Sequence, residues 1–243
     1  CIKFMASVTE AIILNSIKYS ETSVIMKCYS QNYGILSFII KGIRSSKRTK
    51  FSLGSIEPLS IVEIEFNRLK KGELSHLKNI KSVVIYDDLR FNIIKSNIAL
   101  FLAEFLSTVL RFQEENPSLY QYIKDSLVTL DKISKYENFH INFLINLLKF
   151  LGIKPEVNNE NCKFFDIENG IFKAINDSHY CVGGELVIEF KKLLGINFDQ
   201  YFEILKTTNQ RRDMTNFLMN YYKYHISGFK KPNSLGILNG LFS

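Results

Sequence analysis

The spacing of apolar residues changes once along this chain, near Asp87-Asp88, and this change limits the folds that the chain can adopt. Before it, apolar and polar residues alternate as they do in half-buried β-strands. The clearest alternation lies within residues 60–67 and reads Val62, Glu63, Ile64, Glu65, Phe66. After it, apolar residues recur every three or four positions, which is typical of amphipathic helices. The sequence therefore predicts an α+β multidomain protein, with a β domain over 1–82 and a helical domain over 83–243.

Five short segments of the first domain have the composition of strands and are separated by turns. The predicted strands are residues 8–15, 21–30, 35–43, 60–67 and 74–81. Five strands in about 75 residues, with one longer basic connection, suit a small closed β-barrel of the OB-fold type. An SH3-like barrel is the main alternative.

The second domain is predicted to be all-α with one small insertion. Asp87-Asp88 is interpreted as the capping first turn of a helix over 89–112, and Asn116-Pro117 as the start of a helix that runs to about residue 135. A third helix, 139–151, is apolar nearly all round and is expected at the centre of a bundle. Further helices are expected at 184–194, 198–205, 211–225 and after Ser234, and residues 156–183 form a β-hairpin-like insertion.

Positive charge is concentrated in the first third of the chain. The net charge is +7, of which residues 1–80 carry +6, from twelve Lys and Arg against six Asp and Glu. Five cations and no acid follow the third predicted strand: Lys41, Arg44, Lys47, Arg48 and Lys50. Such a cluster suits the phosphates of a nucleic acid, with help from Lys18, Lys70 and Lys71. The alternative is a solvated basic loop without a ligand.

Aromatic side chains near the turns of the barrel are candidates for stacking on bases. These are Tyr19, Tyr29, Tyr33 and Phe51. Packing in the core is the default alternative for all four, because large aromatic side chains are usually buried.

The sequence contains no pattern of a known catalytic site. P-loop, GxGxxG, GxSxG and HExxH motifs are absent. Cys162, His179 and Cys181 have the chemistry of metal ligands, but their spacing is not that of a zinc site. We therefore expect no enzyme activity, no metal or other cofactor, and no small-molecule substrate. The sparse cysteines indicate a reducing cytoplasm, and the apolar segment 139–153 is too short and too polar to cross a membrane.

Several motifs in order along the chain resemble one protein family. The N-terminal ones are Thr9-Glu10-Ala11-Ile12-Ile13-Leu14, Lys18-Tyr19-Ser20-Glu21-Thr22-Ser23, Gly34-Ile35-Leu36-Ser37 and Lys41-Gly42-Ile43-Arg44. They are similar to the N-terminal barrel of the bacterial RecO family of DNA repair and recombination mediators. The C-terminal tract, which runs from Tyr221-Tyr222-Lys223-Tyr224-His225 to Ser234-Leu235, resembles the end of the same family.

This resemblance implies an OB-fold joined to a helical domain and a function in repair of DNA damage. It implies binding of single- and double-stranded DNA without strong sequence specificity, annealing of complementary strands, and a cytoplasmic, nucleoid-associated location. The implied partners are RecR and the acidic C-terminal tail of single-stranded DNA-binding protein, so that RecA is loaded onto DNA. The rival hypothesis is a protein-interaction adaptor whose barrel binds an acidic peptide instead of DNA.

The chain departs from the family pattern at two places. Many members carry two Cys-x2-Cys pairs where this chain retains only Cys162 and Cys181, so we predict a metal-free insertion held by packing of Phe164, Phe165, Ile171 and Phe172. Where some relatives place arginines that meet the acidic tail, this chain has His140-Ile141-Asn142. Other cations are therefore proposed for the tail: Arg211, Arg212, Lys223 and Lys230.

Overall fold

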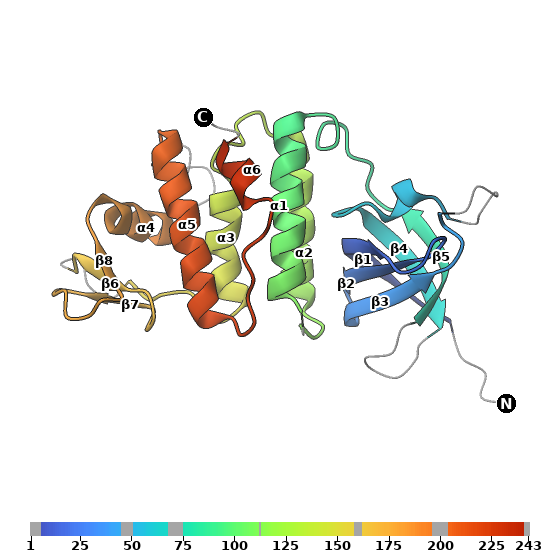
Figure 1. Ribbon diagram of the computed structural model, residues 1–243, viewed down its shortest axis with the longest axis horizontal. Helices are drawn as coiled ribbons and strands as arrows, with labels where there is room; N and C mark the ends of the chain where they lie inside the picture. Colours follow the sequence, from blue (N-terminus) through green and yellow to red (C-terminus); the bar gives the residue numbers. More distant parts are fainter. Residues whose placement is uncertain are drawn as a thin grey trace. The chain divides into compact units, whose positions relative to one another are not determined.

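The computed structural model describes residues 6–44, 51–67, 75–111, 113–157, 162–195 and 204–240 (Figure 1). The chain forms two compact units, residues 1–132 and residues 133–243. The predicted division after residue 82 marks the change from strands to helices, whereas the compact units divide after Lys132. The first two helices are thus part of the same unit as the barrel.

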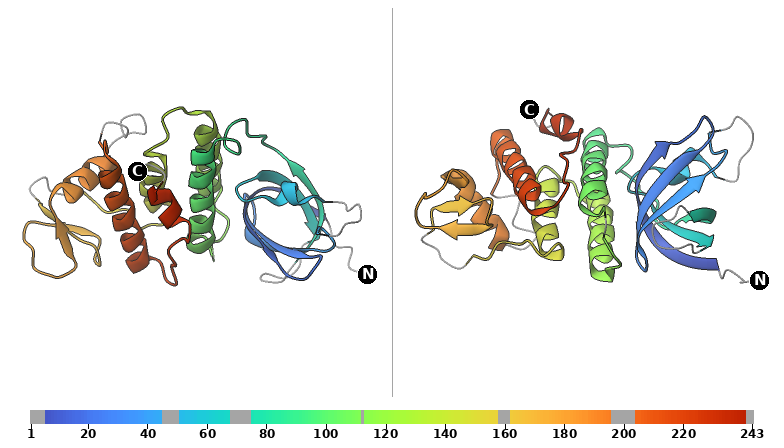
Figure 2. Two further views of the ribbon diagram at one scale, coloured as in Figure 1. Left: turned by 45° about the horizontal axis from the view of Figure 1, so that its top comes forward. Right: turned by 60° about the horizontal axis from the view of Figure 1, so that its bottom comes forward.

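The first unit begins with a closed five-stranded barrel, whose strands curl round one another in the left view of Figure 2. Its strands are β1 (Ala6–Lys18), β2 (Val24–Ser30), β3 (Gly34–Ile40), β4 (Ile61–Asn67) and β5 (Ser75–Ser82), and a short 3-10 turn, η1 (Leu53–Ile56), precedes β4. The order around the barrel is β1-β2-β3-β5-β4. The long β1 pairs with both β2 and β4, and β3 and β5 run parallel. The predicted OB-fold is confirmed.

Alternate residues of the strands fill the barrel, as the period-two pattern predicts. Val62, Ile64 and Phe66 of β4 are buried in the core, while Glu63 between them is exposed. Strand β2 contributes Val24, Met26 and Cys28 to the same core. The burial of this interior raises the pKa of the Cys28 thiol to about 12, so Cys28 is an inert core residue.

The outer face of β1 and β2 is covered by the two helices that follow the barrel, α1 (Ile93–Val109) and α2 (Pro117–Lys132). The carboxylate of Glu10 on β1 pairs with the Lys124 ammonium at 2.6 Å and accepts from the Tyr120 hydroxyl at 3.3 Å. The rings of Tyr29 and Tyr120 lie 6.4 Å apart, and both side chains are fully buried. Tyr29 is therefore buried although it points away from the barrel interior.

The predicted N-cap is correct for α2 and wrong for α1. Asn116 caps α2 as predicted, because its side-chain oxygen accepts the N–H of Leu119 at 3.0 Å. The capping prediction for Asp87-Asp88 is wrong. The N-cap of α1 is Asn92, whose side chain accepts from the N–H groups of Ile94 and Lys95. Asp88 instead forms an ion pair with the buried Lys95 ammonium at 2.8 Å.

A buried carboxylate at the end of α2 fixes the segment that leaves the barrel. Asp131 accepts three backbone N–H groups, from Asp87 at 3.1 Å, Asp88 at 2.9 Å and Leu89 at 2.7 Å. Its backbone carbonyl accepts from the Lys95 ammonium at 2.8 Å. Burial alone raises the pKa of Asp131, but the donated N–H groups and the Lys95 charge outweigh it, so the pKa lies below its ordinary value.

The second unit is a helical bundle that carries a small sheet. Its helices are α3 (Phe139–Phe150), α4 (Glu185–Gly195), α5 (Thr208–His225) and α6 (Leu235–Gly240). Helix α3 is buried on nearly all sides, as predicted, and the Tyr222 hydroxyl of α5 donates to the Leu144 carbonyl at 2.7 Å. The predicted helix over 198–205 lies largely outside the described residues. None of the described helices has the length and apolarity needed to span a bilayer.

The predicted β-hairpin is present and is joined by a third strand. Strands β6 (Phe164–Asp166), β7 (Ile171–Lys173) and β8 (Cys181–Gly183) form a sheet in the order β7-β6-β8. Phe165 is its buried anchor, with ring centroids 4.8 Å from Phe172, 5.2 Å from Phe190 and 5.8 Å from Phe217. The expectation that packing of Ile171 helps to hold the insertion is wrong, because its side chain is 49% exposed.

Candidate nucleic-acid interface

The strand register brings two of the predicted DNA-binding lysines to one end of the barrel. Lys18 ends β1 and pairs with Val24, which in turn pairs with Ile40 at the end of β3. Because adjacent strands lie about 4.8 Å apart, Lys18 and Ile40 are roughly 10 Å apart across the sheet. Lys41 directly follows Ile40, and both lysines are exposed.

A glycine turn adds a third cation at this end. Gly42 has a φ of +75°, a left-handed conformation that favours glycine over residues with a Cβ. The turn buries Ile43 in the barrel core and leaves Arg44 exposed. The Arg44 N–H donates to the Thr22 carbonyl at 3.1 Å, which attaches the segment after β3 to the loop between β1 and β2. We call the surface formed by Lys18, Lys41 and Arg44 the basic end.

Five of the predicted DNA-binding residues lie outside the described part of the chain. They are Lys47, Arg48, Lys50, Lys70 and Lys71. Their assignment stays a prediction. The two segments that form the basic end, residues 16–24 and 40–44, contain one acid. This is Glu21, which is exposed in the loop between β1 and β2.

One exposed side chain near the basic end was not predicted from the sequence. His76 pairs with Ile39 through the parallel contact of β3 and β5, and its ring is exposed. The pairing joins segments 37 residues apart, so only recognition of the barrel topology would have placed His76 here. The sequence otherwise shows His76 as one of four scattered histidines.

The four aromatic residues proposed to stack on bases differ in their exposure to solvent. Tyr29 is fully buried, and Tyr33 and Phe51 pack partly buried against the barrel core. The Tyr33 ring meets the Phe66 ring edge-on, with centroids 5.6 Å apart. Tyr19 differs from these three, because it is 60% exposed in the loop that follows Lys18.

The proposed tail-binding cations lie on the second unit and do not form one cluster. Arg211 and Arg212 lie near the start of α5, and the Arg211 guanidinium donates to the carbonyls of Leu205 and Lys206 at 3.2 and 3.3 Å. Lys223 is twelve residues further along the helix, a rise of about 18 Å. Lys223 and Lys230 are exposed, and the assignment of all four stays a prediction.

His140 cannot present a positive charge at a surface of this unit. It is fully buried on α3, with Nε2 3.0 Å from the Thr215 hydroxyl. Burial, assisted by the nearby Arg211 charge, lowers the pKa of His140 to about 3, so the ring is neutral near pH 7. His140 therefore does not add to the cations predicted to meet an acidic tail.

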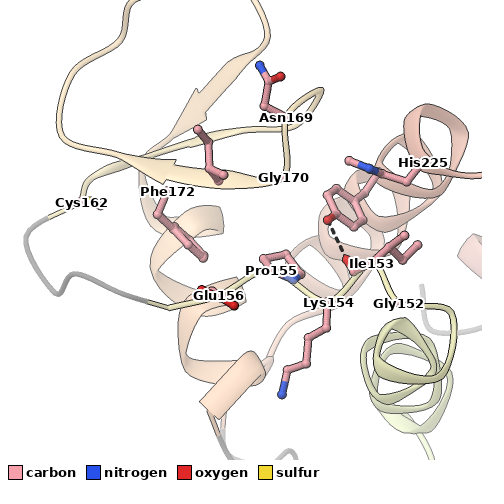
Figure 3. Close-up of a pocket in the computed structure, with 12 residues that line it drawn as sticks. Gly152, Ile153, Lys154, Pro155, Glu156, Cys162, Asn169, Gly170, Phe172 and His225 are labelled. Atoms are coloured by element: carbon pink, nitrogen blue, oxygen red, sulfur yellow. Dashed lines mark hydrogen bonds between the residues drawn. The ribbon is translucent and has the colours of Figure 1, made fainter.

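The second unit also contains a cavity of about 380 Å³ between the chain after α3, the β6–β7 turn and the end of α5 (Figure 3). The Tyr221 hydroxyl donates to the Ile153 carbonyl at 2.8 Å on its wall, and His225 Nε2 lies 3.0 Å from the Ile167 carbonyl. The remaining lining residues are mixed in character, with Lys154 and Glu156 beside Pro155 and Phe172. No group of three His, Cys, Asp or Glu placed to hold a metal ion occurs among the described residues.

Comparisons with known proteins match both parts of the chain to one family. The sequence model for the N-terminal region of recombination protein O matches residues 5–86, and that for its C-terminal region matches residues 90–234. The chain is 36% identical over 234 residues to a DNA repair protein RecO from Christiangramia forsetii, covering 96% of this chain and 98% of that protein.

Two further relatives show the same end-to-end similarity. The DNA repair protein RecO of Flavobacterium psychrophilum is 32% identical over 235 residues, with 97% of this chain and 98% of the relative covered. That of Phocaeicola vulgatus is 31% identical, with 98% and 100% covered. Taken with the OB-fold barrel, its basic end and the helical second unit, these matches show that the chain belongs to the RecO family of DNA repair proteins.

Proposed function

We propose that this chain is a recombination mediator that binds single- and double-stranded DNA through the basic end of its barrel. The observation that carries this proposal is the placement of Lys18, at the end of β1, beside Lys41 and Arg44, in the segment after β3, with all three exposed at one end of the barrel. Lys47, Arg48, Lys50, Lys70 and Lys71 are proposed to add to this surface. Binding is electrostatic and has weak sequence specificity, because phosphate contacts position a protein without reading bases.

Annealing follows from the same electrostatics. A basic surface that holds two complementary strands reduces the repulsion between their phosphates, so pairing is favoured without any covalent step. Together with RecR, the protein then helps load RecA onto DNA that is coated by single-stranded DNA-binding protein. The acidic tail of that protein is proposed to meet Arg211, Arg212, Lys223 and Lys230. The protein acts in the cytoplasm at the nucleoid and is not an enzyme.

The test is a titration of labelled single-stranded and duplex DNA, followed by fluorescence anisotropy at several salt concentrations. Each neutralised phosphate contributes roughly 0.7 (single strand) to 0.9 (duplex) to the negative slope of log affinity against log salt. Five contacts would lower the affinity by about two orders of magnitude between roughly 50 and 200 mM salt. Reversal of Arg44, Lys47 and Arg48 to Glu should weaken binding to both DNA forms and flatten this slope.

A matched control separates local contacts from net charge. The triple variant Lys149→Glu, Lys206→Glu and Lys231→Glu makes the same change in total charge at exposed positions of the second unit. It should leave the slope nearly unchanged. Equal effects of the two triple variants, or no effect of the first, would overturn the assignment to the basic end. Binding of an acidic peptide without binding of DNA would favour an adaptor function instead.

A further inference from the structure

The loop between β1 and β2 holds an aromatic ring in solvent beside the basic end. Tyr19 follows Lys18, and its side chain is 60% exposed. Ile17, two residues earlier, is 55% exposed, so apolar surface extends along the end of the strand. Among the described residues of the barrel, 6–44 and 51–67, no other aromatic side chain is exposed.

Hydrogen bonds close the backbone turn that carries Tyr19. The N–H groups of Tyr19 and Ser20 both donate to the Ser23 carbonyl, at 3.0 and 3.2 Å. Thr22 in the same turn accepts the Arg44 N–H at 3.1 Å. The turn that carries Tyr19 is therefore attached to the segment that carries Lys41 and Arg44, and its backbone loses little freedom when a ligand binds.

The combination of a flat apolar ring and flanking cations fits one chemical class of ligand. Cations bind the phosphates of any nucleic acid, but only unpaired bases offer a free face on which a ring can stack. A duplex keeps its base faces stacked inside the helix. An exposed tyrosine beside a basic surface therefore adds affinity for a single strand and adds little for a duplex.

We infer that Tyr19 is a base-stacking residue that gives the basic end its preference for single-stranded over duplex DNA. This inference rests on the proposed function, since it assumes that the basic end meets phosphates. Stacking on one ring tolerates every base, so the preference is for strandedness and is largely independent of sequence. The Lys and Arg contacts set the salt dependence, and Tyr19 sets the difference between the two DNA forms.

The chain itself allows a direct optical test, because it contains no tryptophan. Tyr19→Trp creates the sole tryptophan of the protein, and its emission should be quenched when a thymidine oligonucleotide binds. Duplex DNA of the same length should cause much less quenching at equal occupancy. The matched control is Tyr224→Trp, on α5, where the side chain is 47% exposed and DNA should leave the emission unchanged.

Affinity measurements give a second, independent readout. Tyr19→Ala should weaken binding of single-stranded DNA roughly 10-fold and leave the salt slope unchanged, because no phosphate contact is lost. Duplex affinity should change by less than about 2-fold, and Tyr19→Phe, which keeps the ring, should restore single-strand binding.

The outcomes distinguish this inference from the proposed function. If the unaltered protein binds no DNA at low salt, the proposed function itself fails. If it binds DNA but Tyr19→Ala weakens single-strand and duplex binding equally, or neither, the stacking role is overturned. Equal quenching of the Tyr19→Trp and Tyr224→Trp variants would also overturn it.

Discussion

The backbone N–H of Arg44 donates to the carbonyl oxygen of Thr22 at 3.1 Å and so joins two loops that are separated by the β2–β3 hairpin. Arg44 belongs to the segment after β3, whereas Thr22 belongs to the turn that carries Tyr19. The bond links the segment that carries proposed phosphate contacts to the turn that carries the proposed stacking ring. The connection between β1 and β2 supplies Lys18 and Tyr19, and the segment after β3 adds Lys41 and Arg44.

Removing the Arg44 side chain should test its share of the phosphate contacts. Arg44→Ala keeps the backbone bond to Thr22, so the loop should retain its position. We expect weaker binding of both DNA forms and a slope of log affinity against log salt that is smaller by roughly 0.7 to 0.9. Anisotropy titrations at several salt concentrations measure both quantities. Lys206→Ala, at an exposed site on the second unit, is the control; an unchanged slope for Arg44→Ala would contradict the prediction.

Gly34 is required where the β2–β3 turn meets the connection between α1 and α2. Its φ is +64°, and a Cβ at this position would lie 2.6 Å from the Gln113 carbonyl oxygen. Gly152 is a matched control, with a φ of +71° and no atom within 4 Å of such a Cβ. Both Ala variants should lose about 1 kcal/mol from left-handed strain, and Gly34→Ala should lose at least about 1 to 2 kcal/mol more from the clash. Denaturant unfolding measures the difference, and equal losses would contradict the prediction.

The Asp131 carboxylate should stabilise the fold in a pH-dependent way. Its pKa is lower in the folded protein than the ordinary 3.8, so its contribution is complete above about pH 4 and is lost as the pH falls through the lower folded value. Asp131→Asn removes a charged acceptor from three N–H groups and should cost about 2 kcal/mol at pH 7. The difference from the unaltered protein should shrink in acid. Asp125→Asn, at an exposed site on the same helix, should cost much less in the same unfolding series.

His140 should couple stability to pH in the same direction as Asp131 but over a higher pH range, because its ring is neutral in the folded protein. Its pKa is about 3 in the folded protein and 6.5 ordinarily, so the unfolded chain binds the extra proton between these values. Stability should therefore decrease as the pH falls below about 6.5, by at most about 1.4 kcal/mol per pH unit from this group. His140→Gln should reduce that dependence between pH 6 and 4. His179→Gln, where the ring is exposed, should leave it as it is.

The sheet of the second unit should depend on Phe165 and not on a metal. Phe165→Ala should cost about 3 to 5 kcal/mol, because it removes a fully buried ring that contacts Phe172, Phe190 and Phe217. Ile175→Ala, at a site that is 67% exposed, is the control. A chelator should leave the thermal unfolding midpoint unchanged. Zinc at one equivalent per chain in elemental analysis would contradict a metal-free sheet.

The barrel strands and the main helices were predictable because the pattern of apolar residues within each element matches its burial. Alternating residues of β4 and the nearly continuous apolar surface of α3 report burial directly in the sequence. The predicted start of a helix was wrong where contacts with residues distant in the sequence determine it. Asp88 loses its expected capping role because Lys95 and the Asp131 carboxylate engage the same segment, and the sequence gives no sign of that contact.

The candidate site was predictable in its charge but not in its geometry. The cluster that includes Lys41 and Arg44 is visible in the sequence, whereas the position of Lys18 beside it depends on strand register. The aromatic candidates show the same limit. Tyr29 lies near a turn and alternates with the core residues of β2, so the sequence leaves both stacking and packing open, and the ring of Tyr120, 91 residues away, decides for burial.

The closure of the barrel restricts how a protein partner can attach to it. Peptides often bind by extending a sheet at an unpaired edge strand, and each barrel strand already has two neighbours. Strand addition to the barrel is therefore limited to the stretches of β3 and β5 outside their short pairing at Phe38–Ser75 and Ile39–His76. The sheet of the second unit differs, because β7 and β8 each have one free side among the described strands. Among the described strands, β7, which displays Ile171, and β8 leave one whole side open to strand addition by a partner peptide.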